Sequence, residues 1–191
     1  METLLGLCVG VGLSAACGFR VFVPLLIMSI ASYSGHLTLA PAFQWIASPA
    51  AIAAFSVATV LEVGGYYVPW IDHLLDAVST PVAMVAGTII TASFVTEVSP
   101  FLQWTLAVVA GGGAAGVIQA STVALRGVST AGTGGLANPV FATAELGGSL
   151  VTSLGALIAP LAVLLVLGAG LVFVAVKVFR FRASRADRSF V

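Results

Sequence analysis

The chain has 191 residues, of which 60% are hydrophobic and only 7% are charged, and its formal net charge is zero. Soluble domains carry about 25% charged residues, so a chain with so few charges cannot build a water-facing surface. The composition therefore predicts an all-α integral membrane protein with no separate soluble domain, and the neutral net charge gives no reason to expect a nucleic-acid partner.

The first apolar run, Thr3 to Tyr33, is too long for one straight span. Its 31 residues would form a helix of roughly 46 Å, whereas the hydrocarbon core of a bilayer is about 30 Å thick. Gly18, Arg20 and Pro24 offer a break, because glycine loosens a helix and proline removes a backbone hydrogen bond. The run is expected either to tilt strongly or to break there.

Later helix starts share one device, an N-cap residue followed by proline at the first helical position. It occurs at Ser48-Pro49, Thr80-Pro81, Ser99-Pro100 and Asn138-Pro139. About six transmembrane helices are therefore expected, near 3–33, 49–68, 72–96, 100–126, 139–153 and 155–181, some of them broken or re-entrant. The third helix begins either at Asp72, with a kink at Pro81, or at Thr80.

The C-terminal end carries most of the positive charge. Five of the seven basic residues lie in the last fifteen positions, at Lys177, Arg180, Arg182, Arg185 and Arg188. Basic residues beside a transmembrane end favour the cytoplasmic side and anionic lipid. We expect a transmembrane domain over 1–181, a basic cytoplasmic tail over 182–191 and, with six spans, a cytoplasmic N-terminus. The location predicted is the bacterial cytoplasmic membrane.

An internal repeat is suggested by two ladders of small residues, each followed by an arginine. Gly6, Gly10, Ser14 and Gly18 precede Arg20, and Gly112, Gly116, Ala120 and Ala124 precede Arg126, each shifted by 106 positions. Glu62-Val63-Gly64-Gly65 is echoed by Glu145-Leu146-Gly147-Gly148. Halves 1–97 and 98–181 with three helices each would form an inverted repeat, as in many secondary transporters. The alternative is coincidence, since glycine and alanine are abundant here.

Small residues at four-residue spacing let helix backbones approach closely in lipid. The two ladders are therefore expected to pack tightly, either within one chain or across a homodimer.

Ionisable groups inside a membrane are expensive and are functional candidates by default. Arg20 is a candidate contact for a substrate or anion, with Glu62 and Glu145 as its expected partners. The alternatives are that carbonyls at the helix break satisfy Arg20 and that the glutamates lie near helix ends. We predict that Arg20 lies within reach of Glu145 or of the segment from Gly134 to Pro139, in an internal polar pocket.

Two further polar groups are candidates. Asp72 and Asp76 lie four residues apart on one helix face beside His73, which suits a proton or a metal ion, although Asp72 could simply cap a helix. Gly134, Gly135 and Asn138 lie in a polar stretch between apolar segments, where free backbone amides at a helix start attract anions. An ordinary surface connection is the alternative.

The chain resembles a family of small bacterial integral membrane proteins that is known only as a domain of unknown function. The resemblance covers most of residues 1–175. It rests on Gly18-Phe19-Arg20 with Pro24, on Pro69 followed by Asp72-His73 and Asp76, and on Gly134-Gly135-Leu136-Ala137-Asn138-Pro139 followed by Glu145. It implies a membrane fold and these polar positions, and it implies no activity.

The function expected from the sequence is transport. A small transporter or channel would bind a small, possibly anionic solute near the midplane between two inverted repeats. The alternatives are an intramembrane enzyme acting on a lipid-linked substrate through Asp72, His73 and Asp76, and a non-catalytic scaffold. The sequence has no zinc, nucleotide or hydrolase motif, so neither a cofactor nor a structural metal is expected.

Overall fold

The structure is a computed structural model that describes residues 2–68 and 71–187. Every regular element in these ranges is a helix. In chain order they are α1 (Glu2–Cys17), α2 (Phe22–Tyr33), the 3₁₀-helix η1 (Pro41–Ala47), α3 (Pro49–Gly65), α4 (Ile71–Phe94), α5 (Pro100–Leu106), the π-helical segment η2 (Ala107–Gly112), α6 (Gly113–Thr133), α7 (Asn138–Ile158) and α8 (Pro160–Asp187). The expectation of an all-α fold is confirmed for the described residues.

Among the described residues, three continuous helices are long and apolar enough to cross a membrane: Leu74–Phe94, Pro100–Thr133 and Asn138–Ile158. A fourth candidate is the pair Pro41–Ala47 and Pro49–Gly65, which is bent by 63°. Shorter apolar helices cover Leu4–Cys17, Phe22–Tyr33 and Pro160–Phe173. The chain is thus a membrane protein, but its helices divide differently from the six spans expected.

Three of the proline signals mark helix starts as predicted, at Pro49, Pro100 and Pro139, and serine caps the first two of these helices. The Ser48 hydroxyl accepts a hydrogen bond from the Ala51 amide at 3.1 Å, and Ser99 caps α5 in the same way. The start proposed at Thr80 is wrong, because Pro81 lies inside α4, where the nearby Ser79 hydroxyl donates to the carbonyl of Asp76.

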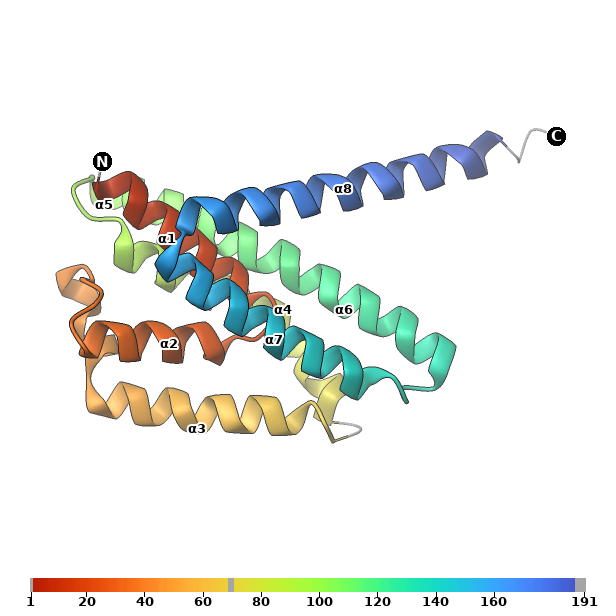
Figure 1. Ribbon diagram of the computed structural model, residues 1–191, viewed down its shortest axis with the longest axis horizontal. Helices are drawn as coiled ribbons and strands as arrows, with labels where there is room; N and C mark the ends of the chain where they lie inside the picture. The colour runs from red at the N-terminus through yellow and green to blue at the C-terminus, as the bar shows by residue number, and fades with distance from the viewer. Residues whose placement is uncertain (1, 69–70, 188–191) are drawn as a thin grey trace.

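The first apolar run breaks and turns back on itself. α1 ends at Cys17, α2 begins at Phe22, and Figure 1 shows the two helices side by side and running in opposite directions. Gly18 permits the close approach of α6 to this turn, since a Cβ there would collide with Ile118 and with the carbonyl oxygen of Ala115 on α6. The predicted break is confirmed at Gly18–Arg20, whereas Pro24 lies within α2.

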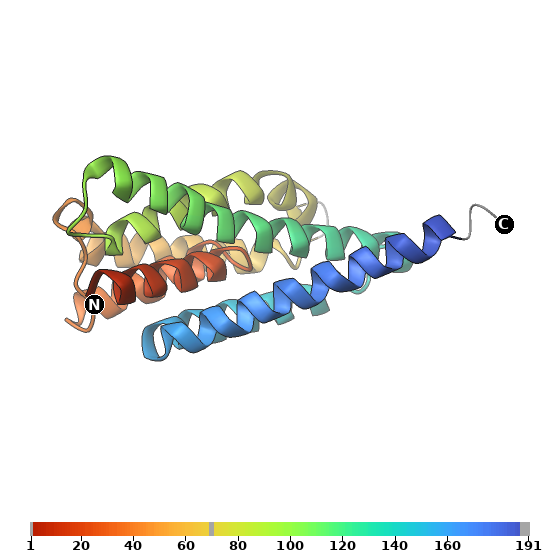
Figure 2. The same ribbon diagram turned by 90° about the horizontal axis from the view of Figure 1, so that it is seen from above.

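This hairpin changes the relation between the two termini. Because α2 returns toward the end where α1 began, the pair makes no net crossing of the bundle, and Figure 1 shows the start of α1 and the end of α8 at opposite ends of the long axis. In Figure 2, α8 runs past the other helices toward the C-terminal end. The stretch 3–33, which was counted as one of six spans, is thus two antiparallel helices.

The two matched ladders run in the same direction. The Ser14 hydroxyl of α1 donates to the Gly87 carbonyl of α4 at 2.6 Å, and Gly10 faces Thr91 one turn further along α4. Gly111 also faces Thr91, while Gly116 faces Met84, so α1 and α6 both run antiparallel to α4. The inverted relation predicted for these segments is therefore wrong: both ladders pack on one helix, and this requires small residues but no inversion.

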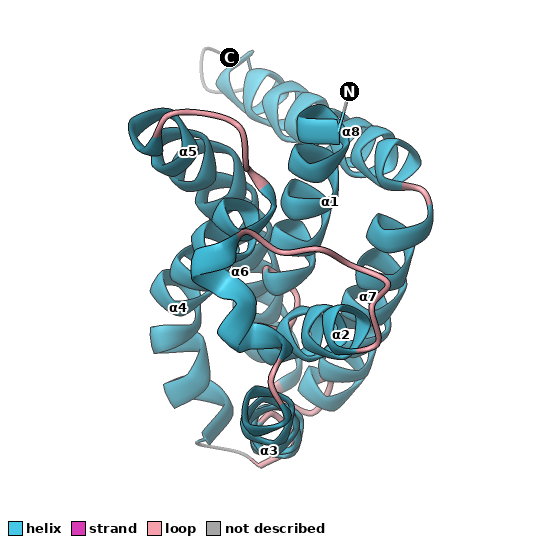
Figure 3. Ribbon diagram, turned by 90° about the vertical axis from the view of Figure 1, so that its left-hand side faces the viewer, coloured by secondary structure: helices cyan, strands magenta, loops and turns pink. Residues whose placement is uncertain are grey.

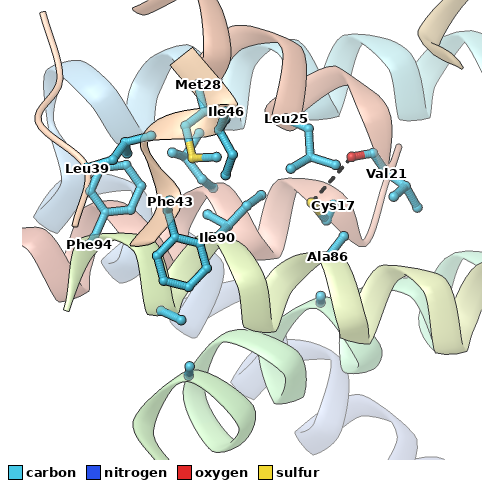
Figure 4. Packing of buried hydrophobic residues seen from close by; sticks show 14 of the residues in the cluster. Cys17, Val21, Leu25, Met28, Leu39, Phe43, Ile46, Ala86, Ile90 and Phe94 are labelled. Carbon is cyan, nitrogen blue, oxygen red and sulfur yellow. Dashed lines mark hydrogen bonds between the residues drawn. The ribbon is translucent and has the colours of Figure 1, made fainter. Parts of the chain in front are cut away.

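Around this contact the helices form a layered bundle. Viewed from its end in Figure 3, α1 lies between α4, α6, α7 and α8, and α3 lies at the periphery, where it packs chiefly on α2 and η1. Figure 4 shows the apolar core between the hairpin, η1 and α4, where Met28, Ile46 and Ile90 meet. The Ser29 hydroxyl donates to the Ile46 carbonyl at 2.5 Å and fastens η1 to α2.

A glycine substitution tests this packing. Gly111→Ala should destabilise the protein by about 1–3 kcal/mol, because the added carbon meets both Thr91 and the Gly87 carbonyl oxygen. Gly113→Ala is the matched control, since the space around its Cβ position is open and alanine favours a helix. Thermal melting in detergent measures both, and equal melting temperatures would contradict the close packing of η2 on α4.

Candidate functional site

Nearly all charged residues of the membrane domain meet in one place. Between residues 3 and 176 the sequence has two arginines and five carboxylates. Six of these seven converge, and Glu97 is the exception. The cluster consists of Arg20 from the hairpin turn, Glu62 of α3, Asp72 and Asp76 of α4, Arg126 of α6 and Glu145 of α7. Five separate segments of the chain thus supply one buried site.

Arg126 is the most fully paired member of this charge cluster. Its Nη1 lies 2.9 Å from Asp72 Oδ1 and 3.0 Å from Asp76 Oδ1, and its Nη2 bonds to Glu145 Oε2. The other oxygen of Asp72 accepts a hydrogen bond from the Asn138 side chain at 2.8 Å. The predicted aspartate face of α4 therefore exists, but both carboxylates hold Arg126.

Arg20 lies at the tip of the hairpin and is almost completely buried, with 1% of its surface exposed. Its Nη2 lies 3.2 Å from Glu145 Oε2 and donates to the carbonyl oxygen of Ala142 at 3.0 Å. The predicted approach of Arg20 to Glu145 is confirmed. One oxygen of Glu145 serves both arginines, so this glutamate joins the hairpin to α6 and α7.

The ring of Tyr66, the residue that follows α3, lies close to both of these cations. The guanidinium carbon of Arg20 is 3.7 Å from the centre of the Tyr66 ring and that of Arg126 is 4.2 Å away. A tyrosine ring attracts cations through its electron-rich face, and more strongly where water is excluded. The aromatic ring therefore helps two like charges to approach one another.

Glu62 was expected to pair with Arg20, but its hydrogen bonds go to the backbone. Its two carboxylate oxygens accept hydrogen bonds from the backbone amides of Val21 at 2.7 Å and Phe22 at 3.0 Å. These are the amides of the N-cap residue and of the first residue of α2, and they have no partner within that helix. A negative charge at a helix N-terminus is also favoured by the helix dipole. Glu62 thus fixes the hairpin tip to α3.

Several donor and acceptor atoms of the charge cluster form no hydrogen bond. Arg20 Nε and Nη1, Arg126 Nε and Glu145 Oε1 are buried and have no hydrogen-bond partner among the described residues. Buried polar atoms are paired in most native structures, so each of these atoms is open to a water molecule or a ligand. Here the open donors are mostly on Arg20, and the open acceptor is on Glu145.

Two apolar cavities reach the charge cluster. A cavity of about 260 Å³ between α6 and α7 is lined by Phe19, Thr122, Leu125, Phe141, Ala144 and Glu145. A second, of about 390 Å³, lies where α2, α3 and α4 meet, and Glu62, Tyr66 and Ser79 contribute to its wall. Charged groups therefore face cavities whose other walls are mainly hydrophobic, as is common in small-molecule sites.

The charge cluster is not at the middle of the bundle. Arg126 and Glu145 each lie seven residues from a helix end, at Thr133 and Asn138, which corresponds to about 10 Å at 1.5 Å per residue. Asp72 is the second residue of α4 at the same end. The charge cluster therefore lies nearer the end of the bundle where α6 ends and where α4 and α7 begin.

The glycine turn has only an indirect connection to the charge cluster. Gly134 and Gly135 adopt φ values of 63° and 88°, a conformation that glycine accepts readily, and Gly134 is exposed. The Gly135 carbonyl accepts the amide of Asn138, so the turn positions this residue. Asn138 was expected to cap α7, but its side chain donates to Asp72 and to Thr130.

His73 lies in α4, but its side chain falls outside the described residues. No group of three metal-binding side chains is found in the described part of the chain. Sequence reasoning did not assign Arg126 and Tyr66 to the site. Arg126 had a usable signal, since it matches Arg20 in the repeat, whereas a tyrosine beside a helix end is ordinary in membrane proteins.

Apolar helices that enclose a charge cluster define this chain as an integral membrane protein of the all-helical class. Residues 7–180 match the model of a family described as a domain of unknown function (DUF4126), and the chain belongs to that family. The comparison with curated proteins found no match, and the comparison with solved structures found none either.

Proposed function

We propose that the protein is a small membrane transporter of the carrier type, in which the charge cluster binds a small polar solute. The observation that carries this proposal is the convergence of six charged side chains beside the turn between α1 and α2. Broken helices of this kind expose backbone groups that only protein, a cavity or a ligand can satisfy. Transporters often build their binding sites at such breaks.

The balance of charge supports a role for protons. Two arginines and four carboxylates give the charge cluster a formal charge of −2 when all are ionised. A net charge buried among apolar helices is costly, so a proton or a bound cation is expected to offset it. Glu145 is the best-placed proton carrier, because it contacts both arginines and keeps one oxygen open.

Counterflow tests the proposal. Proteoliposomes are loaded with unlabelled solutes, in turn amino acids, organic acids and sugars, and diluted into the labelled form of each. A carrier accumulates the label transiently above equilibrium, whereas a channel or scaffold does not. We expect an overshoot for at least one solute class and none for Glu145→Gln. No overshoot with any class would contradict the carrier role.

A second prediction concerns orientation. We propose that α3, α4, α5–α6, α7 and α8 cross the membrane and that the hairpin does not. The basic tail then places the α6–α7 turn in the cytoplasm. In a cysteine-free background, Leu4→Cys and Ser34→Cys should both react with an impermeant maleimide added outside intact cells, and Gly132→Cys only after permeabilisation. Labelling of position 34 but not position 4 would instead favour six spans.

A further inference from the structure

The unpaired atoms of the charge cluster define the chemistry of a ligand. Arg20 offers Nε and Nη1 as donors, and it is 1% exposed. Glu145 offers Oε1 as an acceptor, and it is 6% exposed. Because Arg20 Nη2 lies 3.2 Å from Glu145 Oε2, these open atoms belong to two neighbouring side chains. A ligand that satisfies both must carry an anionic or acceptor group next to a cationic or donor group.

The net charge of the cluster narrows the choice between an anionic, a cationic and a zwitterionic ligand. A simple anion would bind to Arg20 but would add negative charge beside Glu145, Asp72 and Asp76, which already exceed the two arginines in number. A simple cation would suit Glu145 but would leave the donors of Arg20 unused. A zwitterion meets both needs and adds no net charge to a buried site, where uncompensated charge is expensive.

The cavity beside Glu145 supplies the third element of recognition. Apart from Glu145 and Thr122, its walls are Phe19, Leu125, Phe141 and Ala144. The Thr122 hydroxyl is already engaged with the Gln119 carbonyl at 2.9 Å. A ligand held at Arg20 and Glu145 would therefore project an apolar group into this space, whose volume of about 260 Å³ suits a short aliphatic side chain.

We infer that the solute is an α-amino acid with an apolar side chain. Its carboxylate accepts hydrogen bonds from Arg20, its ammonium group donates to Glu145 Oε1, and its side chain lies between α6 and α7. This inference rests on the proposed transport function for the fate of the ligand, while the recognition itself rests on the open atoms and the cavity.

L-Leucine is the probe, and binding is measured by calorimetry with the full-length protein in detergent. Three analogues each lack one element: 4-methylpentanoate lacks the ammonium group, 3-methylbutan-1-amine lacks the carboxylate, and glycine lacks the side chain. We expect leucine to bind and each analogue to bind at least tenfold more weakly. Equal binding of 4-methylpentanoate or of the amine would overturn the inference, and so would no binding of leucine.

A pair of variants ties the probe to the cavity. Ala144→Phe fills the space beside Glu145 and should weaken leucine binding at least tenfold. Val151→Phe places the same side chain at an exposed position of α7 that does not line the cavity, and it should bind leucine as the parent protein does. Unchanged binding by Ala144→Phe, with Val151→Phe also unchanged, would overturn the assignment of the cavity.

The binding and counterflow measurements separate the two proposals. Counterflow of another solute without leucine binding would refute the amino-acid assignment and leave the carrier function standing. Leucine binding at Arg20 and Glu145 without counterflow would confirm the site and refute transport.

Discussion

Arg126→Met is expected to be the most destabilising substitution in the charge cluster. The guanidinium contacts Asp72, Asp76 and Glu145, and it is buried with 3% of its surface exposed. Its removal leaves three carboxylates without their shared cation. Breaking a buried ion pair from one side costs about 3–5 kcal/mol, which corresponds to a fall of roughly 6–20 °C in the melting temperature of a chain of this size.

Lys177→Met is the matched control for this experiment. It removes the same unit of positive charge from an exposed position on α8, where the ammonium lies 5.5 Å from the Phe173 ring centre. The control should melt within about 1 °C of the parent protein, since exposed ionic contacts contribute little. Adding Asp76→Asn to Arg126→Met should recover part of the loss, because it removes one of the negative charges that Arg126 balances. If the two single variants melted alike, the charge cluster would not stabilise the fold.

Arg20→Lys is expected to separate function from stability. Lysine keeps the positive charge beside Glu145 but loses the planar fork and the two open donors of Arg20. The rate of counterflow should fall by about two orders of magnitude, corresponding to the loss of roughly 2–3 kcal/mol of solute binding. The melting temperature should fall far less than in Arg126→Met, because the contact with Glu145 can persist.

The initial rate of counterflow and the melting temperature are measured on the same preparation of Arg20→Lys. Lys177→Arg serves as its control, since it makes the reverse exchange far from the charge cluster. Transport by Arg20→Lys at the parental rate would mean that the site needs only a positive charge at position 20, and the assignment of the open donors would then be wrong.

Several elements of this fold could be predicted because their signals are local. The serine–proline pairs at Ser48 and Ser99 combine a cap and a fixed backbone angle within two residues, and both mark helix starts. The break at Gly18 was likewise predictable from one glycine beside a charged residue in a long apolar run. Pro81 shows the limit of this reasoning, because a helix interior tolerates proline when nearby groups compensate for the missing donor.

The relative direction of the helices could not be predicted from local signals. The match of Gly6–Arg20 with Gly112–Arg126 suggested an inverted repeat, but the direction of a helix depends on how many crossings precede it. A turn of four residues between α1 and α2 reverses the chain, and no pattern of apolar residues distinguishes such a hairpin from a kinked span.

Only some members of the charge cluster could be predicted from the sequence. Each charged residue in an apolar segment needs a partner, so Arg20, Glu62 and Glu145 were natural candidates. Which charges pair depends on the three-dimensional arrangement: Arg126 binds the α4 aspartates, and Glu62 binds backbone amides instead of a side chain. Tyr66 contacts both arginines through its ring face, and no sequence pattern predicts such a contact.

The most direct test of solute binding by the charge cluster is nuclear magnetic resonance of the arginine Nε groups, using protein labelled with ¹⁵N at arginine in lipid nanodiscs. The signal of Arg20 is assigned by its loss in Arg20→Lys. On addition of a solute that gives counterflow, this signal should shift and its exchange with deuterium should slow, while the signals of the C-terminal arginines stay unchanged. An Arg20 signal that does not respond to a transported solute would contradict a binding role for the charge cluster.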